Sequence, residues 1–264
     1  MNVLITGAAG GLGRAFAVEC AKRSYNMLLT DINGSGLEAI KQGLQCQYDV
    51  EVHTFPCDIT RDNAVDDMMD FARQNNIRFD MLLNVAGVDF EGGFTVRQSK
   101  QILDIVKLNI EGTLRVTHAA LNQRRKHSRF HIVFVSSLAS MYPIPLKATY
   151  AASKRFLLDF SIALECELKP EQVSVLSLCP GGLCTTDEAM NGIISQGFWG
   201  NATTNRLEAV AHQTIARALH GRKLYVPGIV NRTFSVLGKL VPARIVAKLL
   251  YGRWIKAQKK WLVT

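Results

Sequence analysis

Short apolar runs alternate along this chain with longer segments of helical period, and this alternation limits its fold more than any other feature. Seven runs are expected to form strands: Val3–Thr6, Met27–Thr30, Val50–Phe55, Met81–Asn84, His131–Ser136, Val173–Leu178 and Leu224–Val226. The segments between them are expected to form helices: Gly11–Ser24, Gly34–Leu44, Arg61–Gln74, Arg97–Arg124, Tyr150–Leu168 and Thr204–His220. Apolar strands that alternate with helices are typical of a parallel sheet covered on both faces. The sequence therefore predicts an α/β fold, a Rossmann-type doubly wound sheet of seven parallel strands in a single domain.

The positive charge of the chain is concentrated near its C-terminal end. The formal net charge is +9, and residues 222–264 contain ten basic side chains and no acidic one. The first 221 residues therefore hold 21 of the 31 basic and all 22 acidic side chains of the chain. A basic patch interleaved with stacking aromatic residues is the feature expected of a nucleic-acid-binding surface. Because the body is close to neutral, we expect no nucleic-acid partner.

Composition divides the chain into residues 1–226, which we expect to bind a dinucleotide and carry catalysis, and a basic amphipathic extension at residues 227–264. After Pro242, apolar residues recur at near-helical spacing with basic residues between them. Three explanations stay open. The apolar face docks on its own domain or on a second subunit, or residues 228–264 make a peripheral contact with an anionic membrane surface. Binding of nucleic acid by the basic residues of the extension is the third and the least favoured.

The six cysteines are scattered without a CxxC pair or zinc-ligand spacing, which is typical of reduced thiols. The histidines form no HExxH motif, so no metal is expected. Because the first strand is predicted to begin at Val3, we expect no leader. The chain also contains no run of 18 apolar residues that would span a bilayer. We expect a cytoplasmic protein, peripheral to a membrane if the extension binds lipid.

The turn after the first strand, residues 6–13, has the sequence TGAAGGLG. Small residues there let the backbone approach a pyrophosphate at the N-terminus of the next helix, although a tight glycine turn without a ligand has the same composition. Asp31 closes the second strand 18 residues after Gly13. A carboxylate at that place accepts hydrogen bonds from the adenosine ribose of NAD and repels the 2′-phosphate of NADP. We therefore expect NAD rather than NADP, while a plain turn into Asn33-Gly34 is the alternative.

Tyr150 and Lys154 are spaced so that they share one face of a helix, and Ser137 precedes them at the end of a strand. A phenol with an ordinary pKa of about 10 is a poor acid–base catalyst at neutral pH, but a nearby ammonium group favours the phenolate. Ser137 can donate a hydrogen bond to a carbonyl oxygen on which charge develops. This combination is much more specific than YxxxK by itself.

These motifs together resemble those of the short-chain dehydrogenase/reductase family, from Val3 to about Val226. The glycine turn matches the family's TGxxxGxG, and three further segments match at family spacing: Cys57-Asp58-Ile59, Asn84-Val85-Ala86-Gly87 for NNAG, and Pro180-Gly181-Gly182-Leu183-Cys184-Thr185 for PGxxxT. Two positions depart from the pattern. Val85 replaces the second Asn of NNAG, and Ser140 replaces the Gly three residues after the catalytic serine, which puts the fine geometry in doubt.

The resemblance implies a catalytic tetrad of Asn109, Ser137, Tyr150 and Lys154. Tyr150 would exchange a proton with the substrate oxygen, and Ser137 would orient that oxygen. Lys154 would lower the pKa of Tyr150 and hold the nicotinamide ribose, and Asn109 would position a water in a proton relay. The expected cofactor-binding residues are Thr6, Gly7, Gly11, Leu12, Gly13, Asp31, Asp58, Ile59, Asn84, Ala86, Gly87, Tyr150, Lys154, Pro180, Gly181, Leu183 and Thr185.

The function implied by the resemblance is an NAD(P)-dependent oxidoreductase that transfers hydride between nicotinamide and a secondary alcohol or ketone, as a homodimer or homotetramer. Apolar residues at 141–145 and in a candidate lid at Thr185–Thr203 favour a lipophilic substrate. A non-catalytic NAD(H)-binding regulatory protein of the same fold is the alternative, and it would typically lack the Tyr or the Lys. An epimerase or dehydratase that uses the same tyrosine is a third possibility, but such proteins are commonly longer.

Overall fold

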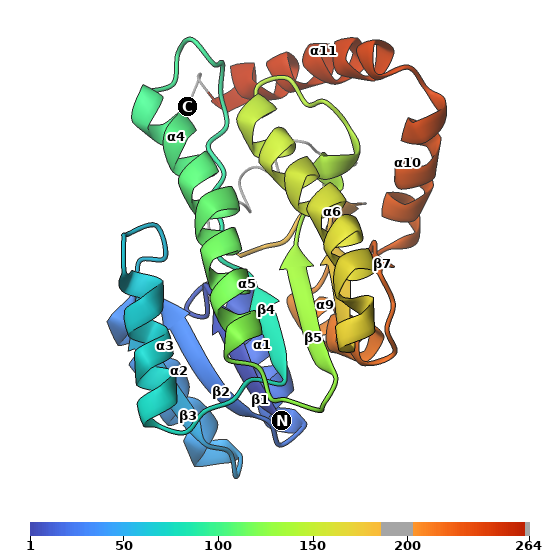
Figure 1. Cartoon of the computed structure of the whole chain (residues 1–264). Helices are drawn as coiled ribbons and strands as arrows, with labels where there is room; N and C mark the ends of the chain where they lie inside the picture. Colours follow the sequence, from blue (N-terminus) through green and yellow to red (C-terminus); the bar gives the residue numbers. More distant parts are fainter. Residues whose placement is uncertain (186–202, 262–264) are drawn as a thin grey trace.

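The computed structural model describes residues 1–185 and 203–261, and it confirms the predicted parallel sheet of seven strands (Figure 1). The strands are β1 (Asn2–Thr6), β2 (Asn26–Asp31), β3 (Val52–Pro56), β4 (Met81–Asn84), β5 (Phe130–Val135), β6 (Val173–Leu178) and β7 (Leu224–Tyr225). Their order in the sheet is β3-β2-β1-β4-β5-β6-β7, and every pair is parallel. The third strand starts two residues later than Val50, and the other limits agree to within about one residue.

Helices cover both faces of the sheet, as buried strands on both sides require. One layer contains α1 (Gly11–Lys22), α2 (Gly34–Gln47) and α9 (Leu207–Leu219), and the other contains α3 (Ala64–Gln74), α5 (Thr113–Asn122) and α6 (Ala148–Leu168). Successive residues of β1 serve the two layers in turn, because Val3 and Ile5 pack in the first core cluster and Leu4 packs in the second.

The carboxyl ends of the central strands lie at the same level of the sheet. Thr6 of β1 is opposite Thr30 of β2 on one side and opposite Asn84 of β4 on the other. The strand order reverses between β1 and β4, and a crevice at such a switch point is the usual ligand site of an open α/β sheet. The register therefore places the glycine turn beside the segment that follows β4.

The helix predicted over Arg97–Arg124 runs without a break from Ser99 to Asn122, but its middle is π-helical, which the sequence did not indicate. The structure has α4 (Ser99–Val106), a π-helical segment η1 (Lys107–Gly112) and then α5. The side chain of Ile59 lies only 2.8 Å from where a Cβ of Gly112 would be, so the wider turn packs closely against the loop after β3. π-Helical turns inside helices are frequent at functional sites, and Asn109 lies in this one. Two short 3₁₀ segments, η2 (Leu138–Met141) and η3 (Lys169–Glu171), complete this layer.

Two helices follow the last strand, α10 (Ile229–Leu240) and α11 (Ala243–Trp261), and the sequence analysis expected only the second. The side chain of Asn231 on α10 is buried and donates hydrogen bonds to the carbonyl oxygens of Pro227 at 2.8 Å and Thr203 at 3.1 Å. The Tyr142 hydroxyl, beyond the end of η2, donates a hydrogen bond to the carbonyl of Phe234. These contacts attach α10 to Thr203, to Pro227 and to the segment after η2.

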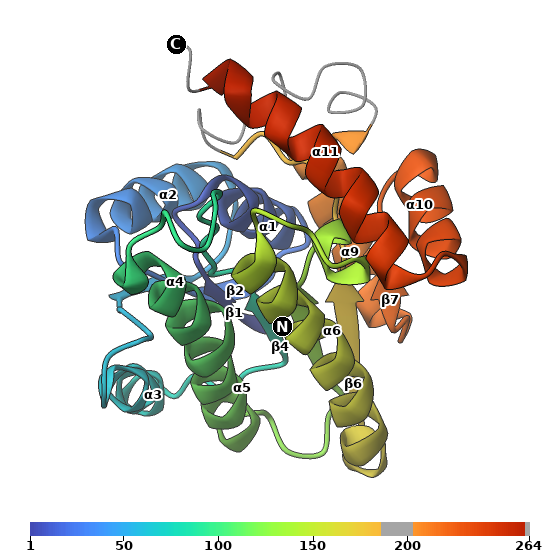
Figure 2. The ribbon, with the colours of Figure 1, turned by 90° about the horizontal axis from the view of Figure 1, so that it is seen from above.

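The last helix runs across the end of the sheet to which the strands point, as seen from above in Figure 2. No helix in the described ranges is both long enough and apolar enough to cross a membrane. The candidate lid at Thr185–Thr203 lies, except for its first and last residues, outside the described residues.

Candidate active site

The glycine turn forms a cradle that side chains would fill. Gly7 has φ +65°, and a Cβ there would come within 2.8 Å of the Ala86 backbone. A Cβ on Gly13 would lie 2.1 Å from the Gly7 carbonyl oxygen, and one on Gly11 would lie 3.0 Å from Cα of Thr185. No side chain caps the N-terminus of α1, so its first amides are available to an anion. This geometry fits the pyrophosphate of a dinucleotide.

Thr6 and Asp31 hold the cradle from both sides. The Thr6 hydroxyl accepts hydrogen bonds from the amides of Val85 at 3.1 Å and Ala86 at 3.2 Å. The Asp31 carboxylate accepts hydrogen bonds from the amides of Ala9 and Asn33, both at 3.0 Å. The two side chains thus connect the first turn to the segments after β4 and β2. Leu12, by contrast, is buried in the core under the turn.

Asn84 and Gly87 lie across the cradle from the glycine turn. The Asn84 side chain donates to the Thr117 hydroxyl at 3.0 Å, and its buried Oδ1 accepts no hydrogen bond from the described residues. A Cβ on Gly87 would lie 3.1 Å from both the Asn109 Oδ1 atom and the Lys154 Nζ atom. Only a glycine leaves both groups in place at this point.

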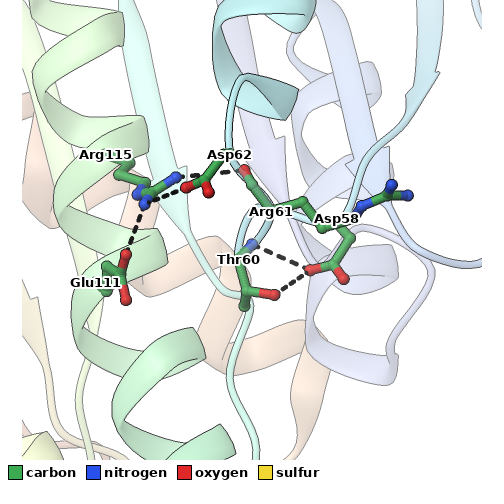
Figure 3. Close-up of polar contacts among 6 residues, drawn as sticks. All are labelled: Asp58, Thr60, Arg61, Asp62, Glu111 and Arg115. Atoms are coloured by element: carbon green, nitrogen blue, oxygen red, sulfur yellow. Dashed lines mark hydrogen bonds and ion pairs between the residues drawn. The ribbon is translucent and has the colours of Figure 1, made fainter.

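The loop after β3 is fixed by charged contacts with α5 (Figure 3). Asp58 accepts hydrogen bonds from the Thr60 amide at 3.0 Å and the Thr60 hydroxyl at 2.7 Å. Arg115 donates to Asp62 at 2.9 Å and to Glu111 at 2.6 Å. Ile59, between these groups, is buried against the π-helical segment. Asp58 and Ile59 therefore have defined positions beside the cradle.

The four tetrad residues come from three elements that meet beyond β4 and β5. Lys154 donates a hydrogen bond from Nζ to the Val135 carbonyl at 2.9 Å, and its Nζ lies 5.7 Å from the centroid of the Tyr150 ring. Asn109 accepts from the Val88 amide at 2.8 Å and donates to the Val88 carbonyl at 3.0 Å. Its amide also donates to the Ser153 hydroxyl at 3.1 Å.

Ser137 connects the tetrad to the segment after β6. Its hydroxyl caps η2 by accepting from the Ala139 amide at 3.1 Å. The next residue, Leu138, donates its amide to the Pro180 carbonyl at 2.7 Å. Gly181 donates to the Asn205 side chain at 3.2 Å, and Thr185 donates to the Leu183 carbonyl at 2.9 Å. The PGxxxT stretch thus lies beside both the tetrad and the glycine turn.

Burial acts on Tyr150 and Lys154 in opposite directions. Burial and the charge of Asp89 raise the pKa of Tyr150 to about 12, against the lowering effects of Lys147 and a hydrogen bond with Ser137. Burial lowers the pKa of Lys154 to about 8. The sequence analysis expected a lowered pKa for Tyr150 through Lys154. In this structure desolvation dominates the pKa of Tyr150, and the same desolvation weakens the charge of Lys154.

The sequence analysis did not single out three charged residues beside the tetrad, namely Lys147, Asp89 and Glu91. Lys147 Nζ lies 5.5 Å from the centroid of the Tyr150 ring and donates to Asp89 at 2.6 Å. Glu91 forms a second ion pair with the same ammonium group. No spacing rule connects residues 89–91 with residue 147, so only the fold brings them together. Among the described residues, no three metal-ligating side chains form a cluster.

A family model described as short chain dehydrogenase matches residues 1–192. The chain is a member of the short-chain dehydrogenase family. Very-long-chain 3-oxoacyl-CoA reductases from Aspergillus terreus and Coccidioides immitis are 31% and 30% identical to it over 175 and 177 residues. Each of these alignments covers 65% of this chain and 50% of the relative. This short-chain dehydrogenase therefore spans about half the length of the curated relatives it matches.

Solved structures confirm the fold of this short-chain dehydrogenase at low sequence identity. A short-chain dehydrogenase/reductase from Burkholderia phymatum in complex with NAD has a TM-score of 0.79 at 19% identity, covering 89% of this chain and 92% of that one. A short-chain dehydrogenase from Sphingobium yanoikuyae in complex with NADPH has a TM-score of 0.72 at 23% identity, covering 90% and 92%. Members of this fold therefore bind either nucleotide.

Substituting Gly13 tests the cradle, because a Cβ there overlaps the Gly7 backbone. We expect Gly13→Ala to lower the free energy of unfolding by about 1–3 kcal/mol, the usual cost of overpacking. We also expect it to remove the rise in unfolding temperature that NAD or NADP gives the parent protein. Gly43→Ala on α2, where nothing lies within 4 Å of the new Cβ, is the control and should keep that rise. Equal stabilisation of both variants by nucleotide would contradict the cradle.

Proposed function

We propose that this short-chain dehydrogenase transfers hydride between a nicotinamide cofactor and a secondary alcohol or ketone, with Tyr150 as the acid–base group. The observation that carries the proposal is that Tyr150 lies next to both Ser137 and Lys154, and that Lys154 lies beside Gly87 at the glycine cradle. A nucleotide-binding regulatory protein has no need of a buried lysine next to a buried phenol, since burying either group ionised costs free energy. The presence of all four tetrad groups thus favours the enzyme over the regulator.

When bound, the nicotinamide cofactor supplies or accepts the hydride. The glycine turn and the N-terminus of α1 would hold its pyrophosphate, and Asp31 would accept hydrogen bonds from its adenosine ribose. Asp58 and Ile59 would line the adenine side, and the segments 84–87 and 180–185 would face the nicotinamide half. The cradle, the uncapped helix terminus and the buried Oδ1 of Asn84 support this assignment.

The chain's own residues handle the proton. Tyr150 gives its phenolic proton to the carbonyl oxygen in reduction and takes it back in oxidation. Ser137 donates a hydrogen bond to the same oxygen as charge develops on it. Lys154 would also hold the nicotinamide ribose. Asn109 holds the Val88 backbone against α6, which keeps Gly87 next to Lys154.

Replacing Tyr150 with Phe removes the proton donor and leaves the ring. We expect kcat/KM for reduction of ketones of graded length and polarity to fall by a factor of about 10² to 10⁴, the usual share of general acid catalysis. Binding of the reduced cofactor, followed by its fluorescence, should change little. Tyr25→Phe, at the start of β2 and remote from the tetrad, is the control. Full turnover by Tyr150→Phe would overturn the proposed role.

The cofactor is proposed to be NAD, because the Asp31 carboxylate would repel a 2′-phosphate. Asp31→Asn keeps an oxygen that can accept from the Ala9 amide but removes the charge. The preference for NADH over NADPH is measured as the ratio of their kcat/KM values. We expect this ratio to fall by about tenfold or more, and a tenfold change corresponds to a free-energy difference of about 1.4 kcal/mol. Glu38→Gln on α2 is a charge-matched control. A wild-type preference for NADPH would contradict the assignment.

A ketone with an apolar chain is the proposed substrate class. Met141, the last residue of η2, and Tyr142, which follows it, are four and five residues beyond Ser137, and both are half-buried. The fungal relatives named very-long-chain 3-oxoacyl-CoA reductases and a solved bulky-bulky ketone specific alcohol dehydrogenase from Comamonas testosteroni support this class. The latter has a TM-score of 0.74 at 20% identity and covers 90% of this chain and 91% of its own. A homodimer or homotetramer stays a prediction of the family resemblance.

The C-terminal extension is proposed to contact an anionic membrane surface. On α11 Val246 and Leu250 are half-buried, whereas Ile245 and Leu249 are 50% and 70% exposed. Arg244 and Lys248 are exposed one position before each of these apolar residues. An exposed apolar stripe beside a cationic stripe, in a segment without acidic residues, suits anionic lipid.

Flotation of the whole chain with phosphatidylglycerol vesicles tests the lipid contact. We expect the parent protein to float with these vesicles and not with phosphatidylcholine vesicles, and we expect salt to release it. The variants Ile245→Ser/Leu249→Ser and Arg244→Gln/Lys248→Gln should float at least several-fold less. Ile162→Ser, at a 55% exposed residue of α6, is the control. Absence of flotation in the parent protein would favour docking on protein instead.

A further inference from the structure

The ion-paired lysine next to the tetrad suggests a function that the family motifs do not include. Lys147 is the residue that precedes α6, and its side chain is only 13% exposed. Asp89 and Glu91 come from the loop between β4 and α4 and both pair with its ammonium group. The same ammonium group lies 5.5 Å from the centroid of the Tyr150 ring, slightly closer than the Nζ of Lys154 at 5.7 Å. Tyr150 therefore faces two lysines.

We propose that Lys147, held by Asp89 and Glu91, is a second cation of the active site that stabilises the phenolate of Tyr150 and so acts as a positioning residue for proton transfer. This inference rests on the proposed function of Tyr150. Asp89 and Glu91 act on Tyr150 in the opposite sense, because their negative charges disfavour a phenolate. The balance between one cation and two anions then sets the pH range in which Tyr150 can accept a proton.

A purely structural role does not account for this cluster. The loop after β4 and the segment before α6 are already joined by a backbone hydrogen bond from Gly92 to Leu146 of 2.8 Å. Leu146 has φ +67°, a conformation that is unfavourable for a leucine and that fixes the direction of the chain just before Lys147. Burying an ion pair adds a desolvation cost and is weak as a source of stability. A charge kept there at such cost is better explained by its effect on the neighbouring phenol.

The two lysines differ in how well they keep their charge. Burial lowers the pKa of Lys154 to about 8, so this side chain loses its proton as the pH rises through about 8. Burial also disfavours the charged form of Lys147, but Asp89 and Glu91 outweigh it and raise the pKa of Lys147 above its ordinary value. Above pH 8, Lys147 is the lysine that still faces Tyr150 with a positive charge. Alcohol oxidation needs the phenolate of Tyr150, which the positive charge of Lys147 favours.

The groups that act on this site come from four parts of the fold. Among the described residues, they are Ser137 at the start of η2, Lys147 and Lys154 before and within α6, Asp89 and Glu91 in the loop after β4, and Cys179 after β6, which interacts with Lys154. Ser137 and Lys147 lower the pKa of Tyr150, and Asp89 and Glu91 raise it. Changes at Lys147 and at its two carboxylates must therefore move the pKa of Tyr150 in opposite directions.

The test compares these changes in the pH profile of kcat/KM for alcohol oxidation. In this profile kcat/KM rises as Tyr150 loses its proton. Lys147→Met should move this rise to higher pH by about one unit or more, the effect expected when a unit charge beside the ring is removed. Asp89→Asn/Glu91→Gln should move it to lower pH, and Lys147→Arg should stay near the parent value. Lys100→Met removes a similar ion pair, 2.7 Å to Asp104 on α4 and away from Tyr150, and should move nothing.

A second readout needs no turnover. Protein labelled with 3-fluorotyrosine is titrated by ¹⁹F NMR, and the Tyr150 signal is assigned by its loss in Tyr150→Phe. Lys147→Met should raise the pKa of Tyr150 in this titration, and Asp89→Asn/Glu91→Gln should lower it. If the double variant fails to fold, the single variants Asp89→Asn and Glu91→Gln should each lower that pKa. Shifts in one direction for both changes, or lost activity without any shift, would overturn the inference. Opposite NMR shifts in a protein that oxidises no alcohol would instead contradict the proposed function and leave the inference standing.

Discussion

The pairing of β1 with β4 is the contact on which the rest of the site depends. Because these two strands are neighbours in the sheet but distant in sequence, the glycine turn and the segment after β4 meet at one edge. Thr6 then bonds the amides of Val85 and Ala86, and Gly7 lies against Ala86 so closely that no side chain fits. The glycine cradle and the proposed tetrad are thus two sides of one junction, and a change in the register of β1 and β4 would separate them.

Features that follow from the local pattern of apolar and polar residues were predictable from the sequence. Features that depend on contacts between distant residues were not. The seven strands follow from apolar runs, and the grouping of Tyr150 with Lys154 follows from helical spacing. The π-helical segment does not follow from any periodicity, because it arises where Gly112 packs on Ile59 and where Asn109 bonds the Val88 backbone. The pairing of Lys147 with Asp89 and Glu91 joins residues almost sixty positions apart and has no sequence pattern at all.

Hydrogen bonds connect the basic extension to the PGxxxT stretch, which its composition did not indicate. Asn231 on α10 donates to Asn205 at 3.2 Å, and Asn205 in turn accepts from the Gly181 amide at 3.2 Å. A Cβ on Gly181 would lie 2.7 Å from the Asn231 side chain. The positions of the PGxxxT stretch and of α10 are therefore set together. A surface contact made by the extension would therefore act on a segment that lies beside the proposed nucleotide site.

The burial of Tyr150 and Lys154 affects the direction in which a proton can be transferred. Burial favours the neutral forms of both Tyr150 and Lys154, so that from about pH 8 to about pH 12 a neutral phenol faces a largely neutral amine. A protonated phenol is the form that carbonyl reduction requires, whereas oxidation requires the phenolate. A site with only these two groups would favour reduction. As the pH rises, Lys154 would lose the positive charge that favours the Tyr150 phenolate, the form that oxidation needs. Lys147, whose charge its two carboxylates maintain, would be the cation that remains beside Tyr150 in that range, while the carboxylates themselves oppose the phenolate.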